Sequence, residues 1–225
     1  MNPAKREEIY KRLAKAMPDP KSELEHTTPY ELLVSVVLSA QATDKGVNLA
    51  TAKLYPVANT PAKIAALGVE GLEGYIKTIG LYHGKAKNVI GLSNILLEKH
   101  GGEVPRSRED LEALPGVGRK TANVVLNVAF GEETLAVDTH VFRVANRTGL
   151  APGKDPLEVE LKLLKVTPPR YLRNAHHYLI LHGRYTCLAK KPLCAKCPIY
   201  EQCEWKEKKQ YAAPAKPAKK MKLPK

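Results

Sequence analysis

The chain has few aromatic side chains and no long uncharged segment. Its 225 residues include two phenylalanines and one tryptophan, and aromatic residues make up 6% of the whole. The longest stretch without a charged residue covers residues 32–43, which is too short to cross a bilayer as a helix. The sequence therefore excludes a membrane-spanning protein. Its 44% hydrophobic residues are enough to build the core of one medium domain or two small ones.

Cysteine is missing from most of the chain. No cysteine precedes Cys187, and all four lie between Cys187 and Cys203. Residues 1–20 mix basic residues with Glu7 and Glu8 and have no apolar core, so they resemble neither a secretory signal nor an acid-poor transit peptide. We therefore expect a cytoplasmic protein, and in that reducing compartment disulfides are rare.

Negative charge is also scarce. Lys and Arg number 36 against 23 Asp and Glu, which gives a net charge of +13. Residues 204–225 hold eight Lys and two Glu and contribute +6, so the remaining +7 belongs to the rest of the chain. This balance predicts an anionic partner such as nucleic acid. Residues 212–225 are mostly Ala, Pro and Lys, a composition that predicts a disordered basic tail.

The alternation of polar and apolar residues that marks strands is absent, whereas helix-start signals recur. Prolines follow several N-cap candidates at the first helical position, and Glu31 is spaced to bond back to a cap at Thr28. We predict an all-α protein with ten or eleven short helices. The N-cap candidates are Thr28, Asp44, Thr60, Ser107, Asp138 and Asp155.

Two segments are apolar almost all round. They cover residues 32–42 and 121–130. Such helices belong in the interior of a helical domain, so we expect these two to be neighbours.

A glycine-containing turn, LPGVGRKTA at residues 114–122, precedes the second of these helices. Glycines at this spacing permit a tight turn whose backbone amides, with the positive end of the next helix, can seat a phosphate. A plain interhelical turn is the alternative. In a basic chain we favour binding to a nucleic-acid backbone. The residues concerned are Gly116, Val117, Gly118, Arg119 and Thr121.

Lys120 and Asp138 are the two residues best suited to chemistry. Lys120 lies at the predicted first turn of the helix beside Arg119, where it is either a nucleophile for Schiff-base formation or one more phosphate-binding lysine. Asp138 follows an apolar pair and precedes a helix. One interpretation of Asp138 is an N-cap. It is compatible with the other, in which an ionised carboxylate there stabilises an adjacent cationic sugar.

The cysteines follow the pattern Cys-x6-Cys-x2-Cys-x5-Cys. Four thiols this close in a reducing compartment predict a metal site, either zinc or an iron–sulfur cluster, and the spacing alone favours zinc. Basic residues lie in or just before the first loop of this cluster, so a phosphate contact is the functional interpretation and a solvated structural loop the alternative. These basic residues are Arg184, Lys190 and Lys191.

Taken together, four motifs resemble the endonuclease III family of DNA glycosylases over the chain up to about Tyr211. They are LLVSVVLSAQATD at 32–44, LPGVGRKTAN at 114–123, VDTHVFR at 137–143 and the cysteine cluster. The resemblance implies a six-helix domain at residues 22–132 that contains a helix-hairpin-helix motif. It also implies a second helical domain from residues 1–21 plus 133–211, with a C-terminal [4Fe–4S] cluster loop. Duplex DNA would bind across the cleft between them.

The resemblance also implies roles for individual residues. Lys120 matches the nucleophilic lysine and Asp138 the family aspartate, while Gln41 and Leu81 match residues that fill the gap left by an extruded base. Asp44 and His140 are further polar candidates for the base pocket. The ligands of the [4Fe–4S] cluster, which replaces the preference for zinc, would be Cys187, Cys194, Cys197 and Cys203.

The function implied is a bifunctional DNA glycosylase and AP lyase of base excision repair. It would remove oxidised pyrimidines from duplex DNA through a lysine Schiff base and nick the strand 3′ to the abasic site by β-elimination. Two alternatives are a monofunctional adenine mismatch glycosylase and a non-catalytic, redox-sensing DNA-binding module. A cleft that encloses one flipped base requires no more than a monomer.

Overall fold

The computed structural model describes residues 1–212, and this part of the chain is helical throughout, with eleven α-helices, one 3-10 helix and no strand. The predicted all-α class and helix number are therefore confirmed. In chain order the elements are α1 (Pro3–Ala16), α2 (Pro29–Leu38), α3 (Asp44–Leu54), α4 (Pro61–Ile76), α5 (Tyr82–Lys99), α6 (Arg108–Glu112), α7 (Arg119–Phe130), α8 (Thr139–Thr148), α9 (Pro156–Val166), α10 (Pro169–Tyr185), η1 (Cys194–Lys196) and α11 (Lys208–Ala212).

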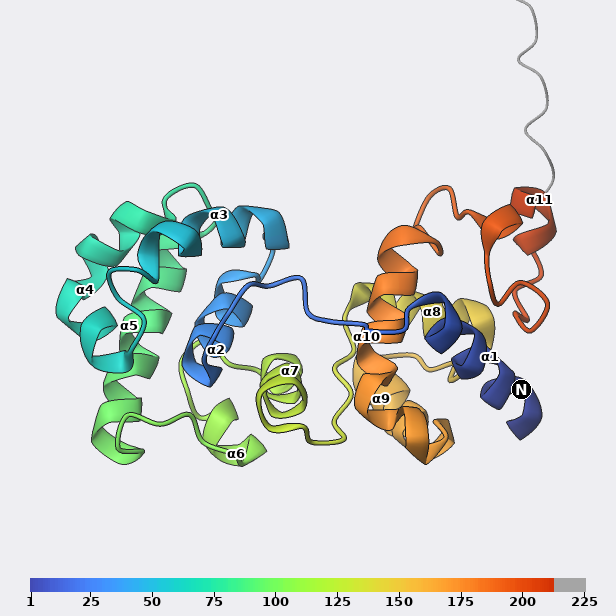
Figure 1. Ribbon diagram of the computed structural model, residues 1–225, viewed down its shortest axis with the longest axis horizontal. Helices are drawn as coiled ribbons and strands as arrows, with labels where there is room; N and C mark the ends of the chain where they lie inside the picture. Colours follow the sequence, from blue (N-terminus) through green and yellow to red (C-terminus); the bar gives the residue numbers. More distant parts are fainter. Residues whose placement is uncertain (213–225) are drawn as a thin grey trace, which may run out of the picture.

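The helices form two groups, each around its own hydrophobic core (Figure 1). Helices α2 to α7 surround one core, which includes Leu33, Leu72 and Leu92. Helices α1, α8, α9 and α10 surround the other, which includes Tyr10 and Leu179. We call these the α2–α7 core and the α8–α10 core. Because α1 belongs to the second core, the chain crosses between the cores after α1 and again after α7 (Figure 1).

Local capping explains where the helices start. The side chains of Thr28, Thr60, Ser107, Asp138 and Asp155 each accept a bond from a first-turn amide, as predicted. The prediction for Asp44 was wrong. Thr43 caps α3 through its bond from the amide of Gly46, and Asp44 is the first helical residue.

A second capping detail also differs from the prediction. The carboxylate of Glu31 accepts a bond from the amide of Thr27, one residue before the Thr28 cap. It also accepts a bond from the Thr27 hydroxyl. The hydroxyl oxygen of Thr28 accepts from the amide of Glu31, so side-chain bonds hold the residues both before and after the start of α2.

Helices α2 and α7 are the interior helices of their core and pack against one another, as predicted. The buried part of α2 ends at Leu38, however, and not at Ala42. After Ser39 the chain turns outward, and Gln41 is exposed. The apolar composition of this segment thus extends past the helix into a surface loop.

The chain returns to the α8–α10 core along an extended segment that carries Asp138 at its end. Leu135 and Val137 lie in the α8–α10 core, whereas Ala136, between them, lies in the α2–α7 core. This is the twofold alternation of an extended backbone. Asn123 of α7 donates to the carbonyl of Leu135 at 3.3 Å, so the segment is tied to α7.

The first crossing, between α1 and α2, is attached to α3. Asn48 donates through Nδ2 to the carbonyl of Glu23 at 2.8 Å, and its Oδ1 accepts from the amide of Glu25 at 3.1 Å. Both bonds come from one side chain of α3, so they hold the linker against that helix.

Two sequence predictions concern the exterior and the end of the chain. Among residues 1–212 no helix is long and apolar enough to cross a membrane. The predicted tail begins one residue too early, because Ala212 is the last residue of α11. The rest of that prediction, residues 213–225, lies outside the residues that the structure describes.

Candidate active site

Lys120 lies in the first turn of α7, directly after the glycine turn. Gly118 is the N-cap of α7 and offers no side chain, so the first-turn amides are not capped by a side chain. Lys120 is exposed at this positive helix end. An anion that approaches the turn would therefore meet free amides and an ammonium group together.

The two glycines of the turn differ in backbone conformation and in the space around them. Gly116 has a φ of +78°, and a Cβ there would lie 2.9 Å from Nδ2 of Asn88, so the local fold requires glycine. Gly118 has an ordinary extended backbone, and a Cβ there would meet nothing within 4 Å. The space beside Gly118 is open for a ligand backbone to approach closely.

Among the other turn residues, Val117 packs into the α2–α7 core, so its side chain faces away from any ligand. Arg119 also differs from the sequence interpretation of a free phosphate-binding side chain. It forms a two-pronged ion pair with the buried Glu160 of α9, with Nη2 to Oε1 at 2.8 Å and Nε to Oε2 at 3.0 Å. The hydrogen bonds that Arg119 donates to this carboxylate raise the pKa of Arg119. The side chain bridges the two cores, while Thr121, half-buried, follows Lys120 in α7.

Asp138 is the N-cap of α8. Its Oδ1 accepts from the amides of His140 at 2.9 Å and Val141 at 2.8 Å. Within residues 1–212 its second oxygen has no hydrogen-bond partner. One oxygen thus fixes the carboxylate, and the other is available to a reacting group.

Lys120 and Asp138 line one cleft of about 580 Å³, although one belongs to α7 and the other to the start of α8. Gln41, Asp44 and His140 line the same cleft. It lies between the two cores, because α3 and α7 supply one wall and α8 and α10 the other. The sequence named each of these residues, and the tertiary structure brings them together.

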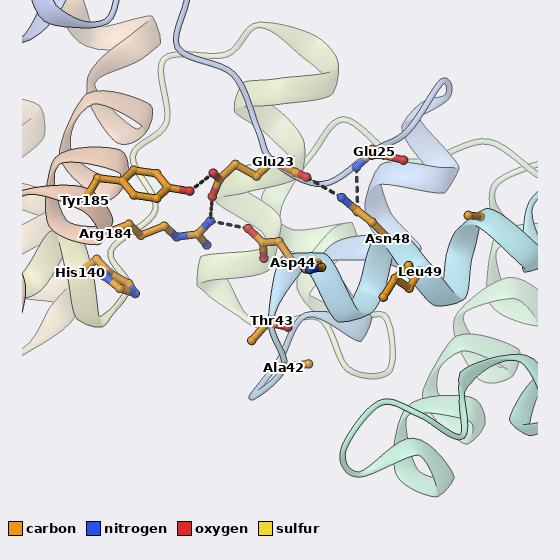
Figure 2. Close-up of a pocket in the computed structure, with 12 residues that line it drawn as sticks. Glu23, Glu25, Ala42, Thr43, Asp44, Asn48, Leu49, His140, Arg184 and Tyr185 are labelled. Atoms are coloured by element: carbon orange, nitrogen blue, oxygen red, sulfur yellow. Dashed lines mark hydrogen bonds and ion pairs between the residues drawn. The ribbon is translucent and has the colours of Figure 1, made fainter.

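Arg184 lines this cleft and also a neighbouring pocket, in which it lies beside Glu23, Asp44 and Tyr185 (Figure 2). Its Nη1 donates to the carboxylates of both Glu23 and Asp44, and the hydroxyl of Tyr185 also donates to Glu23. Burial opposes the charged guanidinium, but the bonds and charges of Asp44 and Glu23 outweigh it and raise the pKa of Arg184. Arg184 thus joins the linker, α3 and α10, a role that its sequence interpretation as a phosphate contact did not include.

Two loops beside the cleft hold strained residues. Gln41 and Leu81 are the two non-glycine residues within residues 1–212 that have positive φ, at 53° and 61°. Leu81 is 64% exposed although it is apolar. A Cβ on Gly80 would lie 4.0 Å from the carbonyl oxygen of Gln41, so the two loops adjoin. Backbone strain of this kind collects at functional sites.

The four cysteines line a single small cavity with Arg147 and His182. Their thiols are free, and burial raises the pKa of Cys197 to about 12. Arg147 closes the cavity, with Nη1 3.8 Å from Sγ of Cys187 and 2.6 Å from the carbonyl of Leu188. In the described part of the chain no three His, Cys, Asp or Glu side chains form a group placed to hold a single metal ion. Lys190 and Lys191 are exposed on the loop between the first two cysteines.

Sequence reasoning missed three residues that contact the site residues or share a pocket with them. Glu23 gave no signal, because a single glutamate in a linker has no pattern. His176 is buried in α10 and lines a small pocket with Lys120. Glu160 resembled any other charged residue on a helix until its burial against Arg119 was visible.

Known proteins resemble the chain over nearly its whole length. Residues 34–169 match the model of the HhH-GPD superfamily base excision DNA repair protein. Endonuclease III from Escherichia coli K12 is 64% identical over 92% of this chain and 99% of its own length. Endonuclease III from Haemophilus influenzae is 61% identical over 94% of this chain and 100% of its own length.

A solved structure supports the same relationship. It is described as a trapped endonuclease III–DNA covalent intermediate and matches with a TM-score of 0.87 and 45% identity. The match covers 93% of this chain and 98% of that chain. The cleft that joins Lys120 to Asp138, the glycine turn and the four cysteines thus occur in a chain that belongs to the endonuclease III family of the HhH-GPD superfamily.

Proposed function

We propose that Lys120 and Asp138 perform the glycosylase and AP lyase reactions of this base excision repair enzyme, and that its substrates are oxidised pyrimidines in duplex DNA. The observation that carries the proposal is their placement in one cleft, with an exposed amine and a carboxylate oxygen free of protein partners. A relative that is 45% identical has been trapped as a covalent intermediate with DNA, which supports a covalent mechanism.

The chemistry follows from the two groups. Nζ of Lys120 attacks the sugar carbon that bears the damaged base, the bond to the base breaks, and the base leaves. The carboxylate of Asp138 stabilises the positive charge that develops on the sugar. The nitrogen then loses a proton, the bond between the sugar carbon and the ring oxygen breaks, and the opened sugar is left as a Schiff base on Lys120. The Schiff base acidifies the neighbouring C–H, and loss of that proton expels the 3′ phosphate and nicks the strand.

DNA binding would use the surface around the cleft mouth. The free amides after Gly118 and the open space beside it suit a phosphate. Gln41 and Leu81, on adjoining strained loops, would enter the stack where the damaged nucleotide leaves it. Lys190 and Lys191 would contact the backbone farther along the duplex. Each of these is a phosphate or shape contact, so binding would place the enzyme without reading sequence.

The damaged base itself would enter the cleft beside Asp44 and His140. Asp44 and Arg184 form an ion pair there, so donors and acceptors face the base edge together. Bases that pair poorly are extruded more easily, which favours damaged nucleotides before the pocket makes any contact. One cleft serves one extruded nucleotide, so a monomer is sufficient, acting on the nucleoid in the cytoplasm.

The four cysteines fit a [4Fe–4S] cluster. Burial raises the pKa values of Cys194, Cys197 and Cys203, and the nearby thiols raise them further, so four thiolates around one cavity require a positive centre. Arg147 supplies part of that charge at the cavity wall. The cluster would close the loop that carries Lys190 and Lys191, a structural role. Its ligands would be Cys187, Cys194, Cys197 and Cys203.

Borohydride trapping tests the proposal. Duplexes with thymine glycol, or with adenine opposite 8-oxoguanine, are incubated with wild type, Lys120→Gln and Asp138→Asn. We expect a covalent adduct on thymine glycol with wild type, none with Lys120→Gln, and a slower one with Asp138→Asn. A Lys120→Gln protein that still formed the adduct would exclude Lys120 as the nucleophile. Release of adenine without any adduct would instead favour the mismatch glycosylase, which the family relationship does not favour.

A further inference from the structure

His176 is a buried polar residue whose role the reaction described above leaves open. It lies in α10, is 4% exposed, and lines a small pocket together with Lys120. Its Nδ1 lies 2.8 Å from the carbonyl oxygen of Ala136. A carbonyl oxygen can only accept, so Nδ1 carries the hydrogen and Nε2 is a bare acceptor.

The ring is uncharged at neutral pH. Burial and the neighbouring His177 lower the pKa of His176 to about 4. The charged groups near it are Lys120 of α7, Asp138 at the start of α8, and Asp44, Glu23, Lys21 and Arg184 around the pocket. A neutral ring can donate one directed hydrogen bond without placing a positive charge next to the amine of Lys120.

The hydrogen bond to Ala136 acts on the segment that carries Asp138. Ala136 is two residues before Asp138, in the extended crossing between the cores. Asn123 holds the α7 side of this crossing through Leu135, and α7 carries Lys120. His176 holds its other side from α10. Two hydrogen bonds to successive carbonyls, together with the bond from the Thr134 hydroxyl to the carbonyl of Asn123 at 2.6 Å, therefore tie the Asp138 segment to both α7 and α10.

We propose that His176 is a positioning residue of the reaction, whose Nδ1–H bond to the Ala136 carbonyl sets where Asp138 stands relative to Lys120. The inference rests on the proposed roles of those two residues. Misplacing a reacting group by about 1 Å can lower a rate by about a hundredfold. This hydrogen bond can therefore affect the reaction rate although His176 does not contact the DNA. The sequence offered no sign of it, because the bond spans 40 residues.

The experiment uses two amide replacements that differ by one methylene. In His176→Asn the side-chain N–H can occupy the place of Nδ1–H and bond to Ala136, whereas in His176→Gln the amide extends to the place of Nε2. Both are polar and of similar size, so their effects on folding should be alike. His177→Asn, at the adjacent buried histidine whose Nδ1 has no partner within residues 1–212, is the matched control.

Single-turnover trapping on a thymine glycol duplex, with equilibrium binding to the same duplex, is the readout. We expect His176→Gln to trap about tenfold to a hundredfold more slowly than wild type, with unchanged affinity, and His176→Asn to recover most of that loss. His177→Asn should match wild type. Thermal unfolding of all the variants shows whether each is folded.

Several results would overturn the inference. Equal rates for wild type and a folded His176→Gln would show that the hydrogen bond sets nothing, and equal defects in the Asn and Gln variants would show that the Nδ1 donor is not the reason. Either result leaves the roles of Lys120 and Asp138 intact. A wild-type protein that formed no Lys120-dependent adduct would refute the proposed function and this inference together.

Discussion

Arg119→Ala should destabilise the protein and leave its affinity for DNA nearly unchanged. The sequence placed Arg119 among the phosphate-binding residues, but the structure pairs it with Glu160 across the two cores. The two predictions are opposite. Replacing a free arginine would lower the affinity for DNA and leave the stability unchanged, whereas replacing a paired arginine lowers the stability.

The size of the effect follows from the burial of the two partners. The Glu160 side chain is 4% exposed and that of Arg119 is 38% exposed. Removing one partner of a fully buried pair costs about 3–5 kcal/mol, because the other charge is left without compensation. Since Arg119 is partly in water, we expect a cost below that range, about 2–3 kcal/mol. For a protein of this length the melting temperature should fall by about 4–12 °C.

Thermal unfolding and salt-dependent DNA binding test this together. Glu160→Gln removes the buried charge and should destabilise less than Arg119→Ala. The double variant Arg119→Leu/Glu160→Leu should recover much of the lost stability, because no buried charge remains. An Arg119→Ala protein with normal melting and a reduced salt slope of DNA binding would refute the reasoning and restore the phosphate contact.

Three further predictions concern the cleft and its surroundings. Leu81→Gly should relieve the left-handed backbone and raise stability by about 1 kcal/mol, while base excision slows because the apolar side chain is gone; unchanged excision would contradict the wedge role. Lys190→Ala/Lys191→Ala should lower the slope of log affinity against log salt by about two, and an unchanged slope would place both lysines off the DNA. His176 has a folded pKa of about 4, below its ordinary value of 6.5, so the unfolded chain binds more protons between these values. Stability should therefore fall as the pH drops from 6.5 toward 4, and His176→Asn should lose part of that slope in acid unfolding curves.

Much of the fold could be predicted from neighbours along the chain. Thr28, Thr60 and Asp155 cap their helices through bonds to amides three residues later, so the signal and its consequence lie in the same few residues. Asp44 shows how close such alternatives are: Thr43, one residue earlier, takes the capping role. The pattern identified the helix, and one hydrogen bond decided its first residue.

Parts of the site could be predicted for the same reason. Lys120 follows the glycine turn directly, and Asp138 caps the helix that it begins, so both positions follow from local motifs. The strain at Gln41 and Leu81 had no such signal, because neither is a residue type that favours positive φ. Those two loops were recognised through the family resemblance alone.

Short-range patterns were enough to establish the helical class, most of the caps, the glycine turn and the spacing of the four cysteines, since each depends on residues within a few positions of one another. The tertiary structure decided what the charged and polar side chains do. Arg119 pairs across 41 residues, Arg184 reaches Asp44 across 140 and Glu23 across 161, and these partners belong to different helices or linkers. Charge alone predicts that these arginines bind an anionic group. The packing of the two cores determines that this group is a carboxylate of the protein itself.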